Sequence, residues 1–164
     1  MNNIILIGMP GVGKSTAGVI LAKVLGYSFV DSDLIIQQKN NRLLREIIEE
    51  EGVDGFIKVE NDVLAELDVE RSVVATGGSA VYGKSAMAHL KEIGTLVYLS
   101  LPYEELSKRL GDIKGRGVVL RPGQTLKDLY EERRVLYEQY ADITVEESGL
   151  SVEETVAEIQ KSIE

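Results

Sequence analysis

Short apolar runs alternate along this chain with longer segments in which apolar residues recur every three or four positions. The run at residues 4–7 is typical of a buried strand, and the next segment places Ile20, Leu21, Val24 and Leu25 on one helical face. The two patterns repeat to the end of the chain. They predict strands at 4–7, 27–30, 72–75, 94–100 and 143–145, and helices at about 16–25, 33–39, 42–51, 54–67, 83–92, 102–110 and 125–140, with a last helix that a Ser151–Glu154 capping box begins.

This alternation of strands and helices predicts the α/β fold class. Consecutive parallel strands need helical crossovers, so we expect a five-stranded parallel sheet with helices on both faces, a three-layer α/β/α arrangement. The whole chain, residues 1–164, is expected to form one domain. In such folds ligands bind beyond the carboxyl ends of the strands. No coiled-coil pattern or large apolar face is visible, and we therefore expect a monomer.

Composition excludes several classes of protein. The net charge of −9 argues against a nucleic-acid partner, because such a surface would be basic. The chain has no cysteine, which rules out disulfides and thiolate metal sites. No apolar run approaches the ~18 residues that a membrane span requires, and no signal-peptide pattern precedes the first strand. We expect a cytoplasmic protein without a membrane partner.

A glycine-rich loop between the first strand and the first helix carries the strongest chemical signal. Residues 8–15 read GMPGVGKS, the G-x-x-x-x-G-K-S pattern of a phosphate-binding loop. Its glycines let backbone N–H groups point at a polyphosphate, and the helix N-terminus adds positive charge. We expect Lys14 to reach the outer phosphates of ATP and Ser15 to ligate Mg²⁺. The expected nucleotide-binding residues are Gly11, Val12, Gly13, Lys14, Ser15 and Thr16. The alternative is a glycine turn before an ordinary helix.

Two carboxylates follow the second strand, at Asp31 and Asp33. Phosphoryl transfer needs an acidic group near the metal and a carboxylate that orients or deprotonates the attacking hydroxyl. We therefore assign Asp31 to Mg²⁺ and Asp33 to the phosphate acceptor. The alternative is that this aspartate pair caps a helix.

Two glycine-rich segments complete the candidate site. Gly77 and Gly78 follow the third strand and offer a backbone that a ligand can approach closely, although a plain turn would also use them. Residues 111–124 contain four glycines and little apolar periodicity. We interpret them as a lid that carries Arg116 over the phosphates and excludes water, with a solvated loop as the alternative. The helical region 33–67 should cover the acceptor.

The chain as a whole resembles the shikimate kinase family. The loop at 8–15, the pair Asp31 and Asp33, the glycines after the third strand, Arg116, and the run RRVLY at 133–137 occur in the family's order and spacing. The resemblance implies a fold like that of nucleoside monophosphate kinases. It also implies transfer of the ATP γ-phosphate to the 3-hydroxyl of shikimate with Mg²⁺.

The resemblance further implies a role for each matching residue. Lys14 contacts phosphates, Ser15 holds Mg²⁺ and Asp31 lies near the metal. Asp33 binds the acceptor hydroxyls as base or orienter. The remaining implied roles are the substrate pocket for Gly77 and Gly78, the lid and phosphates for Arg116, the substrate carboxylate for Arg133, and adenine packing for Arg109.

The chain departs from the family pattern in the acceptor site. The family's Phe-Arg-x-x-Glu run reads FIKVE here, so that Ile57 stands where the family has an arginine that binds the shikimate carboxylate. Lys58 is a poor substitute, because adjacent helix residues point about 100° apart. Lys58 or Arg121 could be recruited in its place. Ser79 replaces the family's third glycine, and Val135 stands where proline is usual.

These observations predict an ATP- and Mg²⁺-dependent kinase of a small hydroxylated metabolite, with shikimate the first candidate. A kinase of another hydroxylated compound, with a smaller carboxylate or none, is an alternative that Ile57 leaves open. A nucleotide-binding regulatory protein without turnover is the second alternative. The joint presence of Asp33 and Arg116 argues against it, since a non-catalytic protein needs neither a base nor a lid arginine.

Overall fold

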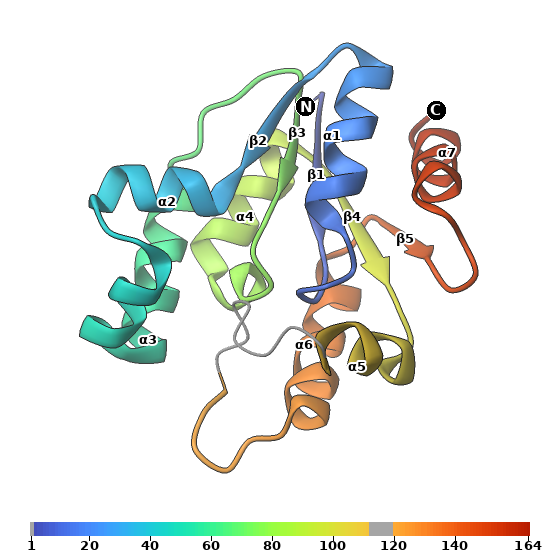
Figure 1. Cartoon of the computed structure of the whole chain (residues 1–164). Coiled ribbons are helices and arrows are strands. Elements are labelled where there is room, and N and C mark those ends of the chain that lie inside the picture. Colours follow the sequence, from blue (N-terminus) through green and yellow to red (C-terminus); the bar gives the residue numbers. More distant parts are fainter. Residues whose placement is uncertain (1, 112–119) are drawn as a thin grey trace.

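The computed structural model describes residues 2–111 and 120–164, and these residues form alternating strands and helices (Figure 1). The strands are β1 (Asn3–Ile7), β2 (Ser28–Asp31), β3 (Ser72–Ala75), β4 (Gly94–Ser100) and β5 (Ile143–Glu146). The helices are α1 (Lys14–Leu25), α2 (Ser32–Asn40), α3 (Leu44–Ala65), α4 (Lys84–Ile93), α5 (Tyr103–Gly111), α6 (Leu126–Tyr140) and α7 (Val152–Ile163), with a short 3₁₀ helix at Ala80–Tyr82. The predicted order of elements is confirmed. The 3₁₀ turn was not predicted, because three residues are too few for a periodic signal.

The strands form one five-stranded parallel sheet in the order β2-β3-β1-β4-β5. All five residues of β1, the central strand, are buried, which explains its uninterrupted apolar sequence. The parallel pairing places the carboxyl ends of all strands at one edge of the sheet. Three segments therefore meet there: the loop after Ile7, the start of α2 directly after Asp31, and the loop after Ala75.

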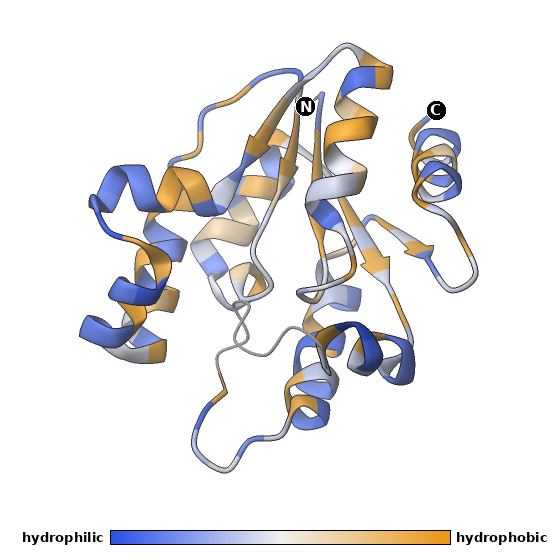
Figure 2. Ribbon diagram, viewed as in Figure 1, coloured by the Kyte–Doolittle hydropathy of each residue, from blue (hydrophilic) through white to orange (hydrophobic). Residues whose placement is uncertain are grey.

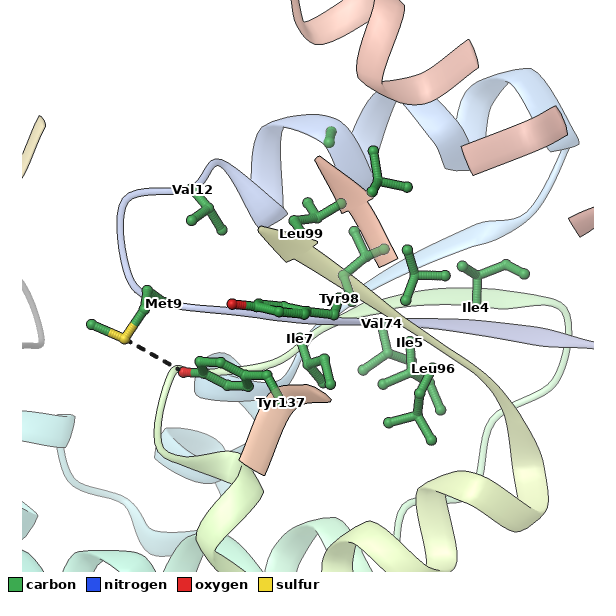
Figure 3. Packing of buried hydrophobic residues seen from close by; sticks show 14 of the residues in the cluster. Ile4, Ile5, Ile7, Met9, Val12, Val74, Leu96, Tyr98, Leu99 and Tyr137 are labelled. Atoms are coloured by element: carbon green, nitrogen blue, oxygen red, sulfur yellow. Dashed lines mark hydrogen bonds between the residues drawn. The ribbon is translucent and has the colours of Figure 1, made fainter. Parts of the chain in front are cut away.

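Helices cover both faces of the sheet, as predicted. Helices α1 and α7 pack against each other on one face, while α4 and α6 lie on the other (Figures 1 and 3). Between α6 and the sheet, the rings of Tyr98 and Tyr137 stack with centroids 5.1 Å apart, and the Tyr137 hydroxyl lies 3.8 Å from the Met9 sulfur. Figure 2 shows hydrophobic colouring along the central strands and largely hydrophilic colouring on α5.

Helix α3 changes direction at Gly52, whose φ of 76° and ψ of 179° are not helical. This backbone region is open almost only to glycine. The sequence predicted two helices, at 42–51 and 54–67. The structure has two helical segments there, and they join directly at Gly52. The break matters to the site because residues from both segments face the same cavity.

The predicted lid at 111–124 is only partly covered by the structure. Arg116 lies outside the described residues, so its role stays a prediction. The described end of the segment forms a turn in which Gln124 N–H donates to the Arg121 carbonyl at 2.9 Å. Thr125 then caps α6 by accepting from Asp128 N–H at 3.1 Å. Within residues 2–111 and 120–164, no helix has the length and apolar character needed to cross a membrane.

At the amino end of the sheet, the buried side chain of Asn3 connects β1 to the backbone next to β3 and β4. Its Nδ2 donates to the carbonyls of Val69 and Ile93, each at 2.9 Å, and its Oδ1 accepts from Ser72 N–H at 2.9 Å. Asn3 is 1% exposed. A side chain that satisfies three backbone groups away from water stabilises the fold because each group would otherwise remain unpaired.

We therefore expect Asn3→Ala to destabilise the protein by about 3 kcal/mol. This corresponds to a melting temperature lower by roughly 6–12 °C for a chain of this size. Differential scanning calorimetry measures the change. The matched control is Asn2→Ala, since the Asn2 side chain accepts an exposed hydrogen bond from Arg71 N–H and makes no other among the residues that the structure describes. Equal melting temperatures for the two variants would contradict this role of Asn3.

Candidate active site

A cavity of about 1220 Å³ lies beyond the carboxyl ends of the strands. Most of the predicted site residues line it together, although they come from distant parts of the sequence. These are Gly11, Gly13, Lys14, Ser15, Thr16, Asp31, Asp33, Gly77, Gly78, Arg109 and Arg133. Val12, by contrast, is 3% exposed and its side chain packs in the core (Figure 3). Any contact of Val12 with a nucleotide would therefore have to come from its backbone.

The phosphate-binding loop forms one end of the cavity. Gly13 adopts a left-handed conformation (φ 89°) as the N-cap residue of α1, so α1 begins at Lys14, directed at the cavity. The Lys14 ammonium donates to the carbonyls of Gly8 at 2.6 Å and Met9 at 2.9 Å. Burial lowers the pKa of Lys14 to about 8, although the nearby Asp33 carboxylate opposes this shift. Arg109 donates to the Gly11 carbonyl at 3.2 Å and so lies over the same loop.

The aspartates lie beside this loop, at the start of α2. Asp31 caps the helix, since its Oδ1 accepts from Asp33 N–H at 2.9 Å, and it also lines the cavity. The helix-cap interpretation is therefore correct for Asp31, but one oxygen suffices for the cap. Burial raises the pKa of Asp33, with the Asp31 charge adding to the effect and the Lys14 ammonium opposing it. A carboxylate with a raised pKa is a better proton acceptor at neutral pH.

Gly77 and Gly78 have no side chains in the place where charged groups from three helices converge. A Cβ on Gly77 would lie 3.0 Å from Asp33 Oδ1 and 3.1 Å from Glu60 Oε2. A Cβ on Gly78 would lie 2.7 Å from Arg133 Nη1. A Cβ on Gly78 would force Arg133 to move, and a Cβ on Gly77 would push Asp33 and Glu60 back by a few tenths of an ångström, so glycine at both positions lets these polar groups come close to the backbone.

Arg133 is the principal buried cation on the acceptor side. It is 4% exposed, and its Nε and Nη1 have no hydrogen-bond partner among the described residues. Its guanidinium lies over the Tyr82 ring, 5.4 Å from the centroid. Arg133 also lines the cavity. An arginine with unpaired N–H groups in such a wall is suited to a carboxylate ligand, which can accept two hydrogen bonds from it.

The neighbouring Arg134 plays no such part. It pairs with Glu131 at 3.0 Å and Glu138 at 3.2 Å on the exposed face of α6. Ile57 lines the cavity, whereas Lys58 points to solvent and pairs with Asp62 at 2.9 Å. Lys58 therefore does not replace the missing arginine, as the helical geometry predicted.

Sequence reasoning missed two buried carboxyl groups. Glu60 is 1% exposed; its Oε1 accepts from Ser79 Oγ at 2.5 Å and its Oε2 has no partner among the described residues. Burial raises the pKa of Glu60 to about 7, against the lowering effect of Ser79 and Arg133. The Phe-x-x-x-Glu spacing in FIKVE was the available signal. Glu147, after β5, is 7% exposed with its pKa likewise raised to about 7 by burial, and no pattern in the sequence marked it.

The donors at the loop fit a magnesium ion that is shared with a nucleotide. Ser15, with its hydroxyl, and Asp31, with its carboxylate, both line the cavity. Within the described part of the chain, no three acidic or histidine side chains come together as a metal site of their own. Mg²⁺ usually takes one or two protein oxygens, with phosphates and water completing the shell, and this donor set suits it.

Comparison with known proteins gives a consistent result. A family model described as shikimate kinase matches residues 10–164. The shikimate kinase of Vibrio parahaemolyticus is 38% identical over 165 residues, covering 99% of this chain and 96% of that protein. Among solved structures, shikimate kinase from Acinetobacter baumannii in complex with shikimate has a TM-score of 0.88 at 37% identity, covering 99% of this chain and 93% of that one. The crystal structure of shikimate kinase from Aquifex aeolicus has a TM-score of 0.83 at 36% identity, covering 98% of this chain and 95% of that one.

Glu60 makes the stability of the fold depend on pH. Its pKa in the folded protein, about 7, lies above the unfolded value near 4.3, so its contribution to stability is full below about pH 4 and is lost as the pH rises through 7. Glu60→Gln keeps the shape and has no proton to lose. We expect the stability of this variant relative to the parent to increase by roughly 2–3 kcal/mol between pH 5 and pH 8.

Denaturant unfolding at pH 5, 6, 7 and 8 measures this difference. Glu49→Gln, which removes an exposed carboxyl group from the wall of the same cavity, is the matched control. A difference between Glu60→Gln and the parent that stays constant over this range would contradict the assignment.

Proposed function

Because the chain belongs to the shikimate kinase family, we propose that it transfers the γ-phosphate of ATP to the 3-hydroxyl of shikimate. The observation that carries the proposal is Arg133, which lines the same cavity as Asp33 and Lys14 and has two buried guanidinium nitrogens without a hydrogen-bond partner among the described residues. A hydroxylated carboxylic acid supplies a partner for both halves of this arrangement. Its carboxylate pairs with Arg133, and its reacting hydroxyl meets Asp33 on the side of the phosphate-binding loop.

Each residue has a defined part in the proposed reaction. Asp33 orients the acceptor hydroxyl and takes its proton, which its raised pKa favours. Lys14 exchanges its contacts with loop carbonyls for the outer phosphates and stabilises the charge that develops on them. Ser15 and Asp31 would hold Mg²⁺, which would neutralise charge on the phosphates. Arg109 packs against the nucleotide base, and Arg116 extends over the phosphates.

Ile57 supports a second candidate, a kinase of a different hydroxylated metabolite. The helix α3 wall of the cavity is largely apolar, with Leu44, Ile48, Phe56 and Ile57 exposed to it. An acceptor with an apolar flank in place of a strongly bound carboxylate would fit that wall. Fold alone does not choose between these acceptors, since specificity depends on the side chains of the site.

The test of function is ATP turnover against a panel of hydroxylated acids and sugars that includes shikimate. We expect shikimate to give the highest kcat/KM, measured by coupled ADP release and by mass spectrometry of the phosphorylated product. Only background ATP hydrolysis across the panel would refute the kinase proposal. Another acceptor that reacts orders of magnitude faster than shikimate would refute the choice of substrate.

Replacing the proposed base tests the mechanism separately. We expect Asp33→Asn to lower kcat by roughly 10²–10⁴, because general-base catalysis is lost while the shape is kept. The KM for ATP should change little. The control is Asp62→Asn, which removes an exposed carboxylate that pairs with Lys58 outside the cavity. If Asp33→Asn turns over as fast as the parent, Asp33 has no part in the chemistry.

A further inference from the structure

The described part of the cavity wall carries five cationic side chains, and they divide by position. Lys14 and Arg109 donate to carbonyls of the phosphate-binding loop, at the nucleotide end. The other three, Arg45, Arg121 and Arg133, lie among residues of α3, the turn before α6, and α6. Arg133 is the buried one. Arg45 and Arg121 are therefore the two candidates for a second cation that binds the acceptor.

The position of Arg121 is set by an ion pair with α3. Its Nη2 donates to Asp54 Oδ1 at 2.8 Å, although the two residues are 67 positions apart in the sequence. Asp54 precedes Ile57 by three residues, and residues at this spacing are neighbours on one helix face, with Cβ atoms about 5–6 Å apart. The Arg121 guanidinium is thus docked one turn from Ile57, at the same wall of the cavity.

Arg45 has no corresponding relation to Ile57. It lies in the first turn of α3, on the segment before the break at Gly52, whereas Asp54 and Ile57 lie on the segment after it. Arg45 lines the cavity but is exposed. It is therefore the matched comparison for Arg121, with the same charge on the same cavity in a different place.

The turn that carries Arg121 is held in place, while its side chain keeps donors available. The backbone N–H of Arg121 donates to Gln124 Oε1 at 3.2 Å, and the Arg121 carbonyl accepts from Gln124 N–H at 2.9 Å, directly before the Thr125 cap of α6. A guanidinium has five N–H donors, and the pair with Asp54 uses only one nitrogen. The Asp54 side chain is 89% exposed, and such exposed pairs are weak, so a ligand carboxylate can compete for the arginine.

We propose that Arg121 is a specificity-determining residue that binds the carboxylate of the phosphate acceptor together with Arg133, at the wall where Ile57 offers no charge. The inference rests on the proposed function, since it concerns the same acceptor. The proposal explains how the cavity could bind an acceptor carboxylate although the wall formed by α3 is largely apolar at Ile57. The second cation comes from the turn before α6, and its pair with Asp54 brings it beside α3, where an acceptor carboxylate can reach it.

The experiment compares Arg121→Gln with Arg45→Gln on two acceptors. One is shikimate, and the other is its neutral analogue with the carboxylate reduced to a hydroxymethyl group. Losing a charged hydrogen-bond partner at an exposed site lowers affinity by roughly tenfold. We expect Arg121→Gln to raise the KM for shikimate about tenfold, with kcat and the KM for ATP nearly unchanged. The KM for the neutral analogue should stay the same, and Arg45→Gln should alter neither value.

A rescue variant separates a direct contact from a structural effect. Ile57→Arg added to Arg121→Gln places a guanidinium one turn from the lost one and should restore most of the affinity for shikimate. The proposal is overturned if Arg121→Gln leaves the KM for shikimate unchanged, or raises it equally for the neutral analogue. It is also overturned if Arg45→Gln has the same effect.

Failure of the proposed function gives a different result. In that case the parent protein itself does not phosphorylate shikimate, whatever the variants do. The same variants are then compared on the acceptor from the panel that does react. An uncharged acceptor, or a KM that Arg121→Gln does not change, would overturn the role of Arg121 as well.

Discussion

The site depends on the absence of side chains at Gly77 and Gly78. Carboxyl groups from α2 and α3 and a guanidinium from α6 approach this backbone so closely that a single Cβ would displace them. Because these two residues follow β3, which pairs with the central strand β1, the sheet fixes where the charges meet. Asp33, Glu60 and Arg133 therefore lie near the phosphate-binding loop in positions that the packing of the fold fixes before a ligand binds.

The charged side chains around Gly77 and Gly78 can be buried because they carry opposite charges. An isolated buried ion is costly, whereas groups that compensate one another in a low-dielectric site keep their orientation without water. The positive charges of Lys14 and Arg133 act on the carboxyl groups of Asp33 and Glu60. The raised pKa of Glu60 shows that these positive charges do not fully offset the cost of burying its negative charge. Among the described residues, two nitrogens of Arg133 and one oxygen of Glu60 have no hydrogen-bond partner. A polar acceptor would give these atoms partners.

Sequence reasoning predicted the elements and most of the site, because the signals for both are local. A buried strand, a glycine loop and the cap at Ser151 each depend on residues that are neighbours in the chain. The docking of Arg121 on Asp54 was not predictable, since it joins positions that only the folded chain brings together. Glu60 was missed for the same reason, because its burial depends on Ser79 and the glycines of another loop. For Asp31 the sequence left a metal ligand and a helix cap open, and the contact from Asp33 N–H to its Oδ1 shows that it caps α2.

The break at Gly52 affects how such a site can be altered. It orients two short helical segments so that both contribute to one wall of the cavity, and the geometry depends on a backbone conformation that other residues adopt only under strain. The lining residues on either side are free of that restriction. A library aimed at new acceptors can therefore vary Arg45, Ile48 and Ile57 while Gly52 stays fixed. The hinge glycine preserves the shape of the wall, and its neighbours determine its chemical character.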